Sequence, residues 1–111
     1  MSSQEIIDTL CDTLNDGIWA LRVLHLEGSM HKEGLWAYVN KFHRECQIEQ
    51  YGNYEEKKIL PSRYSLDIMT ARLEGAGLIT YRQLGRVRIY QVSKLGNVVI
   101  HELEKRAKNN K

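Results

Sequence analysis

The feature that most constrains the fold is the stretch 62–96, where a helical pattern passes directly into a strand–turn–strand pattern. Ser62 follows a proline and predicts a helix start, because a serine hydroxyl can cap a free backbone amide. Residues at helical spacing then predict one buried face, formed by Leu66, Met69, Thr70 and Leu73. Glycines at 75 and 77 end this helix, which we expect over 62–75.

The residues after this helix predict a β-hairpin over 79–92. The segments ITYRQ and VRIYQV flank a short Leu84-Gly85-Arg86 turn. Three arginines lie on the hairpin, at 82, 86 and 88. A helix followed by a basic two-stranded ribbon has a geometry suited to duplex DNA, because the helix fits the major groove.

These segments resemble the winged helix-turn-helix of small bacterial and archaeal transcription regulators. RLEGAGLI at 72–79 is similar to the end of their recognition helix, and RIYQVSKLG at 88–96 to their returning wing strand. LEGSMH at 26–31 is similar to a segment of PadR-like regulators, and MarR-like proteins are the other candidate subfamily. The resemblance covers 17–108 and implies an α+β, mostly helical fold, with a C-terminal two-stranded wing and flanking N- and C-terminal helices.

The expected organisation is a single domain over 1–111. An N-terminal helix over 3–14 precedes a winged-helix core over 17–92, and a C-terminal helix covers 93–108. Within the core we expect a helix from 18 to 28, a short pairing strand at 29–31 and a helix over 34–46. The polar segment 47–60 is expected to connect that helix to the recognition helix.

Charge is distributed unevenly along the chain, although the net charge is only +2. Residues 1–50 contain four Lys or Arg against eight Asp or Glu, whereas residues 51–111 contain twelve against six. Within 62–94 the count is six against two. The cations therefore gather on the expected recognition helix and wing, as in a phosphate-contacting surface.

The outward side of the recognition helix is expected to face DNA. Arg63 lies in the first turn, which enters the major groove in helix-turn-helix proteins, and its guanidinium matches guanine O6 and N7. Arg72 contacts phosphate or pairs with a neighbouring acid. Asp67 has three interpretations: it accepts from cytosine N4, orients Arg63, or stabilises the helix N-terminus. The expected DNA-binding residues are Ser62, Arg63, Tyr64, Ser65, Asp67, Ile68, Arg72, Arg82, Arg86, Arg88 and Lys94.

Apolar stripes on the two flanking helices predict a two-fold homodimer that reads a pseudo-palindrome. The resemblance implies the same, because terminal helices form the dimer interface in PadR-like and MarR-like proteins. A monomer whose helices pack on their own core is the alternative. The expected interface residues are Ile6, Ile7, Leu10, Leu14, Val99, Ile100 and Leu103.

Nothing in the sequence indicates an enzyme, a cofactor or a metal site. His43 and Cys46 share a helix face, yet no second pair has ligand spacing. Cys11 and Cys46 are expected as small buried residues, with a disulfide left open. Trp19, Trp36 and Tyr38 could line an effector pocket, but aromatic residues more often pack in a core. Neither a membrane span nor a signal peptide is recognisable, so we expect a cytoplasmic, nucleoid-associated protein.

Three functions fit these expectations. The favoured one is a sequence-specific double-stranded DNA-binding transcription regulator, with the helix 62–75 in the major groove and the wing 79–92 on the backbone or minor groove. The second is an architectural DNA-binding protein with little specificity and a steep salt dependence. The third is a winged-helix protein–protein interaction module, against which the three wing arginines argue.

Overall fold

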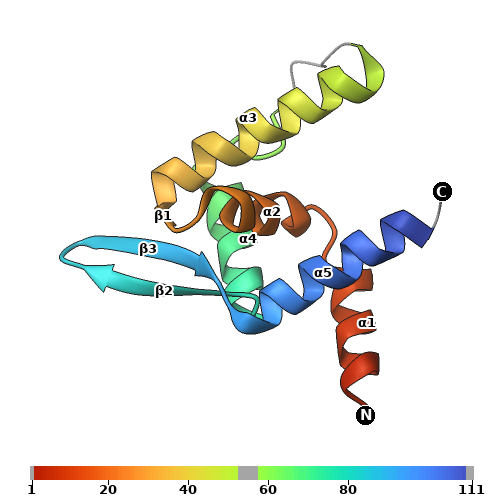
Figure 1. Cartoon of the computed structure of the whole chain (residues 1–111). Coiled ribbons are helices and arrows are strands. Elements are labelled where there is room, and N and C mark those ends of the chain that lie inside the picture. The colour runs from red at the N-terminus through yellow and green to blue at the C-terminus, as the bar shows by residue number, and fades with distance from the viewer. Residues whose placement is uncertain (1, 53–57, 110–111) are drawn as a thin grey trace.

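The computed structural model describes residues 2–52 and 58–109, which form five helices and a three-stranded antiparallel sheet (Figure 1). The predicted fold class, α+β and mostly helical with a C-terminal wing, is confirmed. The elements in chain order are α1 (Ser3–Thr13), α2 (Gly17–Glu27), β1 (Met30–His31), α3 (Lys32–Tyr51), α4 (Arg63–Gly75), β2 (Ile79–Leu84), β3 (Val87–Val92) and α5 (Lys94–Asn109).

The sheet has the strand order β1-β3-β2, so the short strand β1 pairs with the returning strand of the wing. The hairpin of β2 and β3 projects beyond the helices (Figure 1). Leu84 pairs with Val87, which leaves a two-residue turn in which Gly85 has φ 61°. The predicted turn was therefore one residue too long, because a tight hairpin places the positive φ on Gly85 and keeps Leu84 in the strand.

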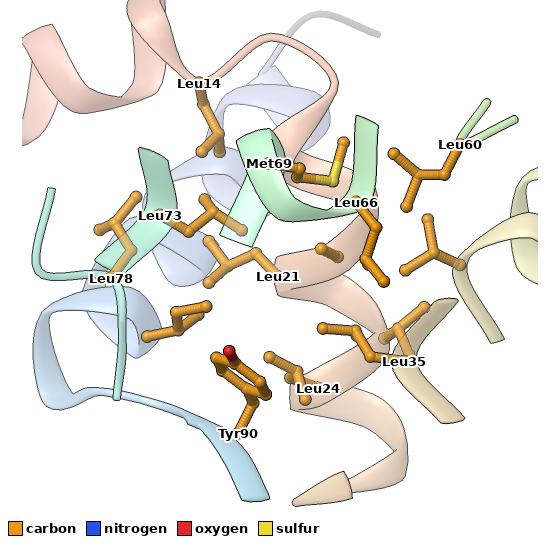
Figure 2. Packing of buried hydrophobic residues seen from close by; sticks show 14 of the residues in the cluster. Leu14, Leu21, Leu24, Leu35, Leu60, Leu66, Met69, Leu73, Leu78 and Tyr90 are labelled. Carbon is orange, nitrogen blue, oxygen red and sulfur yellow. The ribbon is translucent and has the colours of Figure 1, made fainter. Parts of the chain in front are cut away.

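The core lies where α2, α3, α4 and the sheet meet (Figure 2). Tyr90 points from β3 into this core beside Leu24, and it is fully buried. The predicted inward face of α4 is confirmed, because all four of its residues are buried: Leu66, Met69, Thr70 and Leu73. The wing is therefore anchored in the same core that holds α4.

The third helix is longer than predicted. The sequence indicated a helix over 34–46, whereas α3 begins at Lys32 and continues to Tyr51. The apolar stripe ends near Cys46, but the following residues are good helix formers, and Gly52 ends the helix in the left-handed region with φ 76°. Of the connection expected over 47–60, the first part is therefore helical, and residues 53–57 lie outside the described residues.

The last residues of that connection are tied to α3. Leu60 is buried, and its backbone N–H donates to Asn40 Oδ1 at 2.9 Å. Its carbonyl accepts from Trp36 Nε1 at 2.8 Å and from Asn40 Nδ2 at 3.1 Å. These bonds fix the chain just before α4 begins, so they help to orient that helix.

The first and last helices pack against each other. Arg106 of α5 donates to Asp8 at 2.8 Å and to Asp12 at 3.1 Å, both on α1. These charges act together, because hydrogen bonds to Asp12 and Asp8 raise the pKa of the Arg106 guanidinium. Although α1 is amphipathic, it has no buried residue.

Three of the seven predicted interface residues are covered within this chain itself. Leu14, Val99 and Ile100 belong to the hydrophobic core of this chain, with 8%, 0% and 3% of their surface exposed. The sequence showed which helix face is apolar but not what covers it. Ile6 is 43% exposed, and the other predicted interface residues, Ile7, Leu10 and Leu103, are partly exposed.

No helix of the described residues is long and apolar enough to cross a bilayer. Within 2–52 and 58–109, no group of three or more His, Cys, Asp or Glu side chains is arranged to hold a metal ion. Cys11 and Cys46 are free thiols, half-buried rather than fully buried as expected, and burial raises the pKa of each.

Candidate nucleic-acid interface

The start of α4 is fixed by two serines. Ser62 Oγ accepts from the Ser65 backbone N–H at 3.2 Å, and Ser65 Oγ accepts from the Ser62 N–H at 3.1 Å. This reciprocal cap confirms the predicted helix start at Ser62. It also leaves both hydroxyls engaged with backbone groups of their own helix, which limits what they offer to a phosphate.

Four charged side chains meet at the N-terminal ends of α3 and α4. Arg63 pairs with Glu33 through Nη1, and its Nε lies 3.9 Å from Asp67 Oδ1. Lys32 pairs with the same carboxylate of Asp67. A hydrogen bond from Lys32 lowers the pKa of the Asp67 carboxyl, and the charges of Lys32 and Arg63 act in the same direction. We call Lys32, Glu33, Arg63 and Asp67 the charge quartet.

The remaining outward face of α4 turns toward α1. Tyr64, Ile68 and Arg72 line a surface hollow of about 910 Å³, whose opposite wall includes Leu10 and Thr13 of α1. Tyr64 is 74% exposed and Ile68 40% exposed. The helix face predicted to read DNA is therefore divided: Arg63 and Asp67 belong to the charge quartet, whereas Tyr64, Ile68 and Arg72 line this hollow.

The wing presents arginines on both faces of its hairpin. Arg82 lies opposite Ile89 on one face, whereas Arg88 shares the other face with Tyr81 and Tyr90. The Arg88 guanidinium carbon lies 4.3 Å from the centre of the Tyr81 ring, a cation–π contact. A hydrogen bond with Tyr90 and the nearby Tyr81 raise the pKa of Arg88. These contacts with Tyr81 and Tyr90 orient Arg88.

No acidic residue lies within the hairpin, residues 79–92. Arg86 occupies the turn, and Lys94 is exposed at the start of α5 just after the wing. Close to the turn, Leu84 and Val87 are 54% and 46% exposed. The wing is thus an exposed cationic ribbon with an apolar tip.

All eleven predicted DNA-binding residues lie at least partly exposed, but Arg82 and Arg88 lie on opposite faces of the hairpin. Sequence reasoning missed Lys32 and Glu33, whose partners lie on another helix. It also missed Tyr81, although an aromatic residue alternating with arginines was a usable signal. Of the three residues considered for an effector pocket, Trp19 packs against Phe42 and His43, the Trp36 indole donates to the Leu60 carbonyl, and Tyr38 is 43% exposed.

Comparison with known proteins gives an informative relative. No protein-family model matches the chain. The chain is 68% identical over 110 residues to the DNA-binding protein TubR of Bacillus cereus (strain ATCC 10987 / NRS 248), an alignment that covers 99% of this chain and 92% of the relative. This relative supports the prediction of a DNA-binding regulator. It does not support assignment to the PadR-like or MarR-like proteins. With this identity over nearly its whole length, the chain belongs to the family of the DNA-binding protein TubR.

Proposed function

We propose that this chain binds double-stranded DNA sequence-specifically and acts as a transcription regulator. The observation that carries the proposal is the wing, an exposed ribbon with three arginines and no acidic residue. Clustered cations attract phosphates strongly, because each contact releases counterions from the DNA. The name of the 68%-identical relative, a DNA-binding protein, supports the DNA-binding part of this proposal.

In the proposed mode, the first turn of α4 enters the major groove and the wing lies on the backbone or in the minor groove. The hairpin and the N-terminal end of α3 lie on the same side of the molecule (Figure 1), because β1 leads directly into α3 and pairs with β3. An α-helix fits the roughly 12 Å width of the major groove. Arg82 and Arg86 supply phosphate contacts, and Arg63 supplies the base-directed contact.

We further propose that two copies bind together, with α1 at their interface. Although Arg106 ties α1 to α5, none of the 11 residues of α1 is buried within this chain. Its exposed Ile6 and partly exposed Ile7 are continuous with Leu10, which also borders the hollow beside α4. A second copy that covers this stripe would remove exposed apolar surface.

Sedimentation at tens of micromolar tests this arrangement. We expect a dimer for the unmodified chain and a monomer for Ile6→Glu, with the exposed Thr9→Glu on the same helix as the matched control. A monomer for the unmodified chain would contradict the interface.

Binding to a randomised duplex library at two salt concentrations, followed by sequencing of the bound fraction, tests the function itself. An enriched pseudo-palindrome that survives the higher salt supports a dimeric, sequence-specific protein. Uniform binding that disappears with salt supports the architectural alternative instead. No binding at either concentration contradicts DNA binding and favours a protein partner, for which the apolar wing tip of Leu84 and Val87 is the first surface to test.

A further inference from the structure

The charge quartet is unusual for a surface that contacts DNA, because it contains two carboxylates beside two cations. Its side chains are accessible: Arg63, Glu33 and Asp67 are each about half exposed, at 57%, 52% and 48%, and Lys32 is 24% exposed. Exposed ion pairs contribute little to folding stability. Holding the fold together is therefore a weak explanation for a cluster at the first turn of α4.

The quartet carries no net charge. Lys32 and Arg63 bring two positive charges, and Glu33 and Asp67 bring two negative ones. A phosphate approaching this point meets the two carboxylates as well as the cations. The two carboxylates therefore largely cancel the attraction of Lys32 and Arg63 for the phosphates of any DNA sequence.

The paired Arg63 can still recognise a base. A guanidinium has five N–H donors, and the contact with Glu33 uses Nη1. The Nη2 end remains to donate to an uncharged acceptor such as guanine N7 or O6. Carboxylates that hold the guanidinium also reduce its rotational freedom, so they favour contact with a correctly placed base edge over contact with a mobile phosphate.

We propose that Glu33 and Asp67 are specificity-determining, positioning residues: they hold Arg63 and Lys32 in internal ion pairs and so prevent the start of α4 from binding phosphates of any sequence. This inference rests on the proposed DNA binding. In this arrangement the wing supplies affinity for DNA of any sequence, and the charge quartet supplies discrimination between sequences. Specificity is the difference between the affinities for right and wrong sites, so it increases when binding to wrong sites is weakened. The proposal also predicts that loss of the Glu33 or Asp67 carboxylate strengthens non-specific DNA binding. Loss of a residue with a purely structural role would not strengthen that binding.

The test compares Glu33→Gln and Asp67→Asn with the unmodified chain. Each is measured on a duplex selected from the library and on a scrambled duplex of the same length. We expect affinity for the scrambled duplex to rise by about 5–10-fold near 0.1 M salt, as one phosphate contact is gained. Its salt slope should steepen by about one unit. Affinity for the selected duplex should rise less, so the ratio of the two affinities should fall.

Two controls separate this effect from net charge and from folding. Glu104→Gln removes the same charge from the exposed surface of α5 and should leave the ratio unchanged, whereas Glu33→Asp keeps the carboxylate and should retain most discrimination. Thermal melting by circular dichroism checks that each variant is folded. An unchanged ratio in a folded Glu33→Gln or Asp67→Asn variant, while the unmodified chain prefers its selected duplex, overturns this inference alone. No DNA binding by the unmodified chain overturns the proposed function and this inference with it.

Discussion

The wing and the start of α4 both present cations to solvent, but they use them in opposite ways. In the wing, Arg82 and Arg86 have no acidic residue on their hairpin. At the start of α4, Lys32 and Arg63 are each matched by a carboxylate. The difference teaches that a count of basic residues does not identify a DNA-reading surface, because only unmatched cations add affinity for every sequence.

The largest effect is expected where the wing joins the body. Gly96 is buried at the start of α5, and an added Cβ would overlap the Leu78 carbonyl oxygen and lie 2.8 Å from Val92 Cγ1. Since the first neighbour is backbone, Gly96→Ala should force α5 away from the base of β2 and destabilise the fold by several kcal/mol, on the order of an overpacked core. Denaturant unfolding measures this change in the free energy of unfolding. A variant as stable as the unmodified chain would show that the backbone at Leu78 and Gly96 can shift to accommodate the added Cβ.

The next largest effect concerns the wing itself. Replacing Arg82 and Arg86 with alanine removes two unmatched cations, so DNA affinity should fall by about tenfold or more and the salt slope by about two units per protomer. Lys105→Ala with Lys108→Ala removes the same charge from the far end of α5 and should have a small effect. If both double variants lose affinity equally, the wing has no special role.

A smaller effect should come from the cap of α4. Ser62→Ala removes the acceptor for the Ser65 N–H and should cost about 1 kcal/mol, or a Tm lower by about 4 °C. Ser62→Asp keeps an acceptor and should restore most of that loss. The charge quartet depends on the position of this turn, so DNA discrimination should weaken in parallel with Tm. A lower Tm with unchanged discrimination would separate the cap from the quartet.

The smallest effect is expected for the aromatic support of Arg88. Tyr81→Leu removes the ring beneath the guanidinium but leaves its charge, so DNA affinity should fall by only about 2–5-fold with the salt slope nearly unchanged. Tyr81→Phe keeps the ring and should bind almost as the unmodified chain does. Equal losses in both variants would indicate that the hydroxyl matters rather than the ring.

Local signals predicted much of the fold. The serine before α4, the apolar spacing within it and the alternation in the wing each act over a few residues, and the structure follows all three. The extension of α3 to Tyr51 was missed because its last turns are polar and lie beyond the apolar stripe. Periodicity also identified apolar faces on the flanking helices, but whether the same chain covers a face depends on tertiary packing.

The candidate site was less predictable for the same reason. Arg63 was expected to face DNA with its charge available, yet its partner Glu33 lies 30 residues earlier on another helix. The sequence suggested three roles for Asp67, and the structure adds a fourth: its carboxylate pairs with Lys32 of α3. Pairings of this kind depend on how two helix ends meet, which no spacing within one helix reveals.

The contact between α1 and α5 also has a consequence for the order in which this protein is completed. Arg106 lies 94 and 98 residues after its partners Asp12 and Asp8. During synthesis α1 therefore emerges long before the arginine that secures it. Until then its apolar stripe stays accessible to other chains or to chaperones. Helix α1 is therefore made well before Arg106 can hold it, so shortening α5 before Arg106 should release α1 from α5.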